Sequence, residues 1–223
     1  MAAVRRVHWN PHRPDTAALD EVVRAIRGGR IVAIPTDTLY GLAVDPFQAA
    51  AVEKIFDVKG RPAERALPLI AADAEQVREH LGRLTPIADR LAARFWPGPL
   101  TLLIAAPPAL SPRISAETGK VGVRVPAHDT ARLLCRACGI PLTATSANIS
   151  GEAPSADPDV IARSLGERID LLVDAGVTSG GLPSTIVDAT GREPVLVRAG
   201  RIAWEDVLEC LERRSLNEGG RSS

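Results

Sequence analysis

Short apolar runs alternate with longer amphipathic segments along most of the 223 residues, and this alternation constrains the fold more than any other feature. The short runs are rich in Val and Ile, which favour strands, whereas the longer segments repeat apolar residues with the 3.6-residue period of a helix. We expect strands at residues 30–34, 67–71, 100–105, 121–125, 141–144, 169–173, 184–187 and 194–197. A first helix starts at a cap on Asp15 or Thr16 and ends at Gly28 and Gly29, and further helices cover residues 49–58, 73–81, 85–95, 129–138, 157–165 and 204–214.

This order of elements predicts an α/β fold in which helices flank a twisted sheet. Some late strands are too close in sequence for a helical crossover, so we expect a mixed sheet with parallel and antiparallel pairs. No Gly/Ser-rich linker divides the chain. We therefore expect a single domain over residues 15–214, preceded by an irregular N-terminus at 1–14 and followed by a disordered tail at 215–223.

Charge and aromatic content argue against general binding to nucleic acid. The chain carries 27 Lys and Arg against 27 Asp and Glu, which gives a formal net charge of zero. Proteins that coat nucleic acid or an anionic membrane normally have a positive excess. Aromatic residues make up 3% of the chain, too few for a platform that stacks on bases.

Cysteine usage and the N-terminal composition point to the cytoplasm. An odd and small number of cysteines, Cys135, Cys138 and Cys210, is typical of a reducing compartment. Residues 1–15 lack the apolar stretch of a secretory signal, and the longest apolar run, 100–110, is too short for a bilayer. We therefore expect a cytoplasmic protein with no membrane contact.

Polar clusters directly after predicted strands are the main candidates for a site, because ligands of α/β proteins gather beyond the strand ends. Five clusters stand out, at residues 35–41, 59–62, 123–126, 146–151, and 184–188 together with 198–200. The sequence has no G-x-G-x-x-G, no P-loop and no G-x-S-x-G motif. Cys135 and Cys138 lie in a predicted helix without a second ligand pair, which favours core packing over a metal or redox role.

Two clusters offer cations to an anion. Lys59 and Arg61 flank a glycine at a helix end, which suits a phosphate clamp and equally suits basic residues that complement a helix C-terminus. Arg124 stands in an otherwise apolar strand, where a guanidinium needs an anionic partner. That partner is either a structural ion pair or the carboxylate or phosphate of a ligand.

The remaining polar residues also leave two interpretations. Ser146, Asn148 and Ser150 offer small donors and acceptors to a nucleotide, or form an Asx or Ser turn. Thr36 and Asp37 follow a strand directly, where they either orient a metal or polar substrate or cap a helix.

Taken together and in this order, the five clusters resemble those of the YrdC-like L-threonylcarbamoyladenylate synthases, the TsaC enzymes of tRNA modification. The resemblance covers residues 19–202. It implies that ATP, L-threonine and bicarbonate are converted to threonylcarbamoyl-AMP and pyrophosphate, with Mg2+ held mainly by the phosphates. It also implies a downstream threonylcarbamoyl transferase complex as partner and leaves open a weak direct contact with tRNA.

The resemblance assigns roles to individual positions. The catalytic positions that it implies are Lys59, Arg61 and Arg124. Contacts with ATP are implied for Lys59, Arg61, Ser146, Asn148, Ser150, Ser155 and Arg198. A threonine pocket is implied for Thr36, Tyr40, Arg124 and Ser184, with Arg124 on the carboxylate and no protein ligand to a metal. The four cations among these residues, Lys59, Arg61, Arg124 and Arg198, come from separate loops and strands. Together they can form a concave cationic pocket even though the chain has no net charge.

The sequence departs from the family pattern in three places. Many longer relatives have a histidine where this chain has Ala72. A threonine that some relatives place before the strand arginine falls near Lys120, with Thr118 close by, and is not assigned. The second, C-terminal domain of the longer relatives is also missing from the expected architecture.

The reaction implied by the resemblance needs positioning and charge neutralisation more than a protein nucleophile. This agrees with a sequence that shows no Ser/His/Asp arrangement. Two other functions stay open: a non-catalytic RNA-binding or ribosome-assembly module, and a domain that forms a carbamoyl-adenylate. Strict preference for threonine over serine is also open, because one methyl contact is worth only about 1 to 3 kcal/mol.

Overall fold

The computed structural model describes residues 4–10, 13, 15–60 and 66–212, so Arg61 and the predicted tail at 215–223 lie outside the described residues. Its helices are α1 (Thr16–Arg27), α2 (Ala49–Lys59), α3 (Ala74–Leu81), α4 (Pro86–Phe95), α5 (Pro112–Ser115), α6 (Asp129–Cys138), α7 (Pro158–Leu165), the 3-10 helix η1 (Gly166–Arg168) and α8 (Trp204–Glu212). Its strands are β1 (Arg5–His8), β2 (Val32–Ile34), β3 (Gly41–Ala43), β4 (Leu69–Ile70), β5 (Leu100–Ala105), β6 (Lys120–Arg124), β7 (Leu142–Thr143), β8 (Thr145–Ser146), β9 (Leu171–Asp174), β10 (Thr185–Asp188) and β11 (Val195–Arg198).

The strands form two sheets. The first sheet has the order β1-β9-β2-β3-β8, and the second has the order β11-β10-β5-β6-β4-β7. Both are mixed: in the second sheet, for example, β5 pairs in parallel with β10 and antiparallel with β6. The prediction of a mixed α/β fold flanked by helices is confirmed, although the strands divide between two sheets where we expected one.

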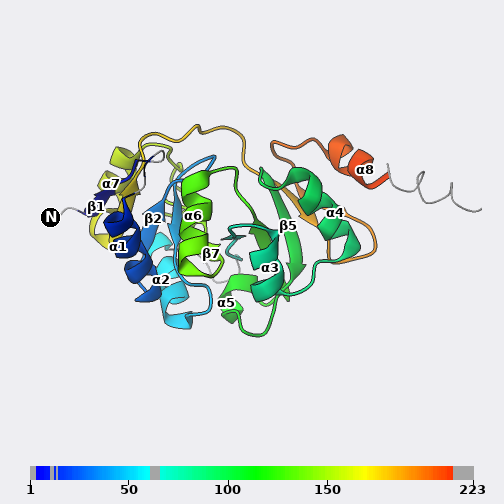
Figure 1. The fold of residues 1–223 in the computed structure, drawn as a ribbon, viewed down its shortest axis with the longest axis horizontal. Coiled ribbons are helices and arrows are strands. Elements are labelled where there is room, and N and C mark those ends of the chain that lie inside the picture. Colours follow the sequence, from blue (N-terminus) through cyan, green and yellow to red (C-terminus); the bar gives the residue numbers. More distant parts are fainter. Residues whose placement is uncertain (1–3, 11–12, 14, 61–65, 213–223) are drawn as a thin grey trace, which may run out of the picture.

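The two sheets lie at opposite ends of the molecule, joined in part by a long segment after β9 (Figure 1). Helices α1, α2 and α7 lie with the first sheet, and α3, α4 and α8 lie with the second. The connecting segment, residues 175–184, runs from β9 in the first sheet to β10 in the second. It therefore joins the two halves of the fold directly.

The N-terminal segment corrects one prediction. We expected residues 1–14 to be irregular, but Arg5–His8 forms β1 and pairs in parallel with β9, with Val7 opposite Val173. Only Val7 of the four strand residues is buried, so the local sequence has no clear alternation. The strand forms because β9, more than 160 residues away, supplies its hydrogen bonds. The order of apolar and polar residues in such a short edge strand gives no sign of that partner.

Strand β6 shows how the second sheet separates a core from a polar face. Val121 and Val123 are fully buried in the main hydrophobic cluster, which also contains apolar residues of α3 and α4. The alternate residues, Gly122 and Arg124, lie on the opposite face. The pairs Leu103 with Gly122 and Ile186 with Thr101 extend that face across β5 and β10. One face of the sheet is thus covered by helices, and the other is left to form a cavity.

A second hydrophobic cluster lies between α1, α6 and the first sheet, and it contains Cys135 and Cys138. Both thiols are buried and free. Burial raises the pKa of the Cys135 thiol and raises that of Cys138 to about 11. Core packing, the interpretation favoured by their helical position, is what the structure shows for this pair. Among the described residues, no helix is long and apolar enough to cross a membrane.

Candidate functional site

A cavity of about 590 Å³ lies between the two sheets, within the range of small-molecule sites. Its lining comes from both halves of the fold. The loop after β2 and the turn at β8 contribute from the first sheet, β5, β6, β10 and β11 from the second, and residues 181–184 from the connecting segment. Six of the residues singled out from the sequence line this cavity: Thr36, Tyr40, Arg124, Ser146, Ser184 and Arg198.

The loop between β2 and β3 is shaped by Thr36. Its buried hydroxyl donates to the backbone oxygen of Leu39 at 2.6 Å and accepts from the backbone N–H of Thr38 at 3.3 Å. β2 and β3 pair antiparallel on either side of this loop, and no helix begins in it. The helix-cap interpretation of Thr36 and Asp37 is therefore wrong, and the contact of Thr36 with threonine stays a prediction.

Tyr40 holds the start of the connecting segment. Its hydroxyl donates to the backbone oxygen of Gly176 at 2.8 Å and accepts from the backbone N–H of Ala175 at 3.2 Å. The side chain is fully buried, and burial raises its pKa to about 12. Through these two contacts with the backbone, Tyr40, which is also one of the lining residues, stabilises the connection between the sheets.

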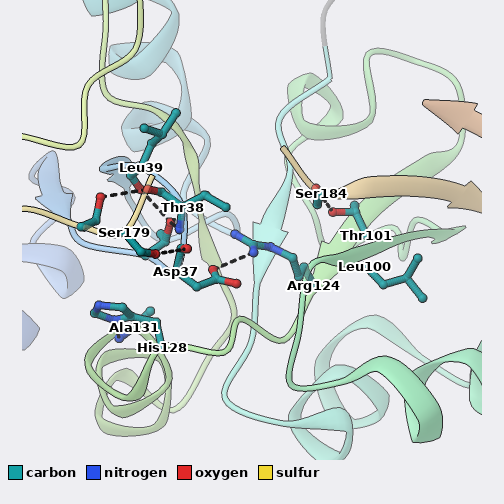
Figure 2. A network of polar contacts seen from close by, with 12 residues as sticks. Asp37, Thr38, Leu39, Leu100, Thr101, Arg124, His128, Ala131, Ser179 and Ser184 are labelled. Atoms are coloured by element: carbon teal, nitrogen blue, oxygen red, sulfur yellow. Dashed lines mark hydrogen bonds and ion pairs between the residues drawn. The ribbon is translucent and has the colours of Figure 1, made fainter. Parts of the chain in front are cut away.

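Arg124 reaches from β6 toward the loop of the first sheet and forms an ion pair with Asp37 (Figure 2). Its Nη1 lies 2.7 Å from the Asp37 Oδ1, and both side chains are 10% exposed. Arg124 also lines the cavity. The structural ion pair that the sequence left open is thus present, while the contact with a ligand carboxylate stays a prediction.

Arg198 of β11 belongs to a polar chain with Ser184 and Thr101 at the second sheet. Its Nη2 donates to the backbone oxygen of Ser184 at 2.7 Å, and the Ser184 hydroxyl is 2.8 Å from that of Thr101. Burial and the nearby Arg124 lower the pKa of the Arg198 guanidinium, a sign that the two cations face one space. Thr101 was missed from the sequence. The signal for it is the alternation of β5, which places this threonine on the face opposite Leu100 and Leu102.

Lys59 lies beside the cavity, outside the set of residues that line it. It is 3% exposed, and its Nζ donates to the backbone oxygen of Asn148 at 2.8 Å and to the Asn148 Oδ1 at 3.1 Å. A further bond goes to the backbone oxygen of Ser146. In this structure the ammonium therefore binds the turn that carries Ser146 into the cavity, and phosphate binding by Lys59 stays a prediction.

The turn at Ser146 is closed by its own side chains. The Ser146 hydroxyl donates to the Asn148 Oδ1, and the Asn148 amide donates to the backbone oxygen of Glu152 at 2.7 Å. Asn148 thus holds this turn through its side-chain amide, whereas the Ser150 N–H, which an Asx turn would direct to the Asn148 Oδ1, donates to the Lys59 backbone oxygen. The contact of Asn148 with a nucleotide stays a prediction. Ser150 is exposed and Ser155 donates and accepts within its own loop, so neither lines the cavity. Their contacts with ATP stay predictions.

The cavity has few groups that could hold a metal. No three His, Cys, Asp or Glu side chains come together as ligands in the part of the chain that the structure describes.

Ala72, where many relatives have a histidine, is buried, and its backbone N–H donates to the Gln76 Oε1 at 2.9 Å.

A family model matches this chain over most of its length. The Sua5/YciO/YrdC model, described as "Telomere recombination", matches residues 24–200. A threonylcarbamoyl-AMP synthase of Bacillus subtilis is 39% identical over 195 residues, which are 87% of this chain and 56% of that protein. One from Vibrio vulnificus is 35% identical over 184 residues, which are 82% of this chain and 98% of that protein.

Solved structures agree with the sequence matches. Pyrococcus abyssi Sua5 in complex with L-threonine superposes with a TM-score of 0.86 at 34% identity, covering 94% of this chain and 61% of that one. Escherichia coli YciO superposes with a TM-score of 0.78 at 27% identity, covering 90% of this chain and 96% of that one. The chain thus spans little more than half the length of the Bacillus relative and nearly all of the Vibrio relative.

Proposed function

Because the chain belongs to the Sua5/YciO/YrdC family, we propose that it is an L-threonylcarbamoyladenylate synthase. Its substrates are then ATP, L-threonine and bicarbonate, and its products threonylcarbamoyl-AMP and pyrophosphate. The observation that carries the proposal is the cavity between the two sheets, into which Arg124 and Arg198 bring cations and Ser146 and Ser184 bring hydroxyls.

The proposed reaction has two steps. Bicarbonate takes up a proton and gives CO2 and water, and the ammonium of threonine loses a proton to become the neutral amine. The amine nitrogen then bonds to the carbon of CO2 and releases a second proton to solvent, which leaves an N-carboxylate. An oxygen of that carboxylate then attacks the α-phosphorus of ATP, the bond from that phosphorus to the bridging oxygen breaks, and pyrophosphate leaves. Neither step requires a covalent bond to the protein, so the protein's task is to hold the two substrates in line and offset their charge.

The residues of the cavity suit these tasks. Arg124 offers a guanidinium to the carboxylate of threonine, and Thr36, Tyr40 and Ser184 surround the amino acid. Arg198, from β11 of the same sheet as Arg124, is the second arginine of the cavity lining and a partner for the phosphates. Support for threonine as the substrate comes from the Pyrococcus abyssi relative, which was solved in complex with L-threonine.

ATP occupies the part of the cavity next to the Ser146 turn in this proposal. Ser146 and Asn148 would contact the nucleotide, with Lys59 and Arg61 on the phosphates and Ser150 and Ser155 nearby. Mg2+ would arrive with the triphosphate and offset its charge. Since Lys59 binds the turn in this structure, a phosphate contact requires the ammonium to exchange one of its oxygen partners for a phosphate oxygen.

The proposed product is a mixed anhydride of a carbamate and a phosphate, an activated group that can be passed on to an acceptor. We propose a threonylcarbamoyl transferase complex as that partner, with tRNA as the final acceptor and the cytoplasm as the location. A direct contact with tRNA would be weak, because the chain has no net positive charge.

The proposal is tested by measuring pyrophosphate release from ATP with threonine and bicarbonate present together or omitted one at a time. Release that requires both supports the proposal, and equal release without either one contradicts it. Arg198→Ala should reduce the rate about tenfold to a hundredfold, as expected for a lost charged hydrogen bond. Arg192→Ala, an exposed arginine in the adjacent β10–β11 loop, is the matched control and should keep the wild-type rate.

A further inference from the structure

The Asp37–Arg124 ion pair bridges the two halves of the fold beside the cavity. Asp37 lies in the loop after β2 of the first sheet, and Arg124 is the last residue of β6 in the second. Both side chains are 10% exposed, so neither charge is well solvated. A pair this buried is held by its mutual attraction, and removing one partner leaves the other charge uncompensated.

The loop that carries Asp37 is fixed from its other side. The Asp37 backbone oxygen accepts from the Ser179 hydroxyl at 2.9 Å, and the Thr38 backbone oxygen accepts from the Thr178 hydroxyl at 2.8 Å. The backbone N–H of Gly180 adds a third bond to the Thr38 oxygen at 2.9 Å. The connecting segment therefore fixes the backbone of the loop that carries the Asp37 carboxylate, and Figure 2 shows Ser179 beside this loop.

The ion pair with Asp37 uses one donor group of Arg124. The described hydrogen bond goes through Nη1, while a guanidinium has five N–H donors in a planar fork. Arg124 is also one of the residues that line the cavity. A carboxylate that enters the cavity can bind the free edge without displacing Asp37.

Charge decides which ligand fits that edge. The cavity lining includes two arginines, Arg124 and Arg198, and no Asp or Glu among the described residues. Among the ion pairs of the described residues, one involves either of these two arginines, and it joins Asp37 to Arg124. It thus offsets one of two positive charges and reduces the attraction for a bare anion.

We propose that Asp37 is a positioning residue that orients Arg124 and adapts the subsite to a zwitterionic α-amino acid. The inference rests on the proposed function, since Arg124 is taken to bind the substrate carboxylate. The α-ammonium of an amino acid lies next to its own carboxylate, so it enters the field of Asp37 when the carboxylate binds Arg124. The two charges of the amino acid then each have an opposite charge nearby: its carboxylate has Arg124, and its ammonium has Asp37. An acid without the amine has no charge to offer to Asp37.

The test is a set of binding titrations by calorimetry with L-threonine, ATP and 3-hydroxybutyrate, the analogue of threonine without its amine. Asp37→Asn keeps an acceptor for Arg124 and removes the charge, Asp37→Ala removes both, and Asp37→Glu restores the charge. We expect Asp37→Asn to weaken threonine binding about tenfold to a hundredfold, the range of a lost charged hydrogen bond. Binding of 3-hydroxybutyrate should fall much less or become tighter, and ATP binding should stay within about twofold of wild type.

The matched control is Asp188→Asn, which breaks a carboxylate–lysine pair with Lys120 in the same sheet at 2.6 Å. Neither Asp37 nor Asp188 lines the cavity, but Asp37 pairs with the lining residue Arg124, whereas the partner of Asp188 in this ion pair, Lys120, lies outside the lining. The Asp188→Asn variant should therefore bind threonine as the wild type does. Partial recovery in Asp37→Glu and a lower selectivity for threonine over 3-hydroxybutyrate in Asp37→Asn support the proposal.

Two results overturn it in distinguishable ways. A folded Asp37→Asn variant that binds threonine as tightly as the wild type, or that loses threonine and ATP binding equally, overturns the role of Asp37 alone. A wild-type protein that binds none of the three ligands overturns this role together with the proposed function.

Discussion

His128, a residue near the site, caps a helix through a contact that depends on the protonation of its ring. It is the N-cap of α6, where its Nδ1 accepts from the backbone N–H of Ala131. Burial lowers its pKa, the carboxylates of Asp37 and Asp129 oppose that shift, and Arg124 adds to it. The capping contact requires the neutral ring, since a protonated Nδ1 has no lone pair to accept with.

The pKa of His128 predicts the direction of a stability change. A histidine in the unfolded chain has a pKa of about 6.5, and the folded value is lower, so protons favour the unfolded state between the two values. We expect the free energy of unfolding to fall as the pH drops below about 6.5. Urea unfolding at pH 8 and pH 5.5 measures this loss.

His128→Asn is the matched variant, because its amide oxygen can still cap α6 and does not titrate in this range. It should lose less stability than the wild type between the two pH values. The same loss in both proteins would show that another group causes the pH dependence. His128→Ala should be less stable at both pH values, by about 1 kcal/mol for a lost cap.

At the scale of an element, β6 positions the site through the alternation of its two faces. Gly122 lies on the cavity face, two residues before Arg124. A Cβ built at Gly122 would come within 3.3 Å of both the Leu103 Cδ2 and the Thr101 Cγ2. These contacts involve side-chain atoms, which can shift, so the backbone of β6 can accept a larger residue here. The glycine matters instead because it leaves the space next to it open to the cavity.

We therefore expect Gly122→Val to leave the fold intact and to fill part of the cavity beside Arg124. The KM for threonine should rise by about tenfold or more, as for a substrate that meets about 1.4 kcal/mol of steric cost, with a smaller change for ATP. Val123→Ala, on the buried face of the same strand, is the control. It should lower the unfolding free energy through a core cavity and keep the KM for threonine. A threonine KM that does not respond to Gly122→Val would place the amino acid away from β6.

At the scale of the whole molecule, the cavity joins two sheets that share one hydrophobic core. The main cluster contains Ala33 and Leu42 of the first sheet together with Leu102 and Val123 of the second. The ion pair between Asp37 and Arg124 also connects the two sheets, beside the cavity. Shared burial of this kind favours cooperative unfolding of both halves, so the single domain stays a prediction that an unfolding experiment can test.

Calorimetry of the free protein should therefore show one unfolding transition. ATP and threonine at about one hundred times their Kd should each raise the unfolding free energy by about 2.7 kcal/mol and shift that same transition upward by roughly 5 to 10 °C. Arg124→Ala should lose the shift with threonine and keep the shift with ATP. Two separate transitions, of which only one responds to ligands, would contradict the single domain.

The sequence by itself determined the elements that have a strong local signal. The helix at Asp129–Cys138 and the strand at Leu100–Ala105 have the predicted bounds, because their apolar periods and their flanking breakers act over neighbouring residues. The family resemblance of the polar clusters also implied one pocket for Thr36, Arg124 and Ser184, and all three line the same cavity.

Tertiary structure alone decided the remaining features. The strand β1, the partner of Arg124 and the role of Thr101 depend on residues far away in the chain: β9, Asp37 and Ser184. Lys59 likewise turned out to bind the turn at Asn148, 89 residues away. Such contacts follow from how the sheets pack, and a charge or hydroxyl in a local pattern does not say which distant group will balance it. For that reason the residue types of the site could be predicted, whereas their partners could not.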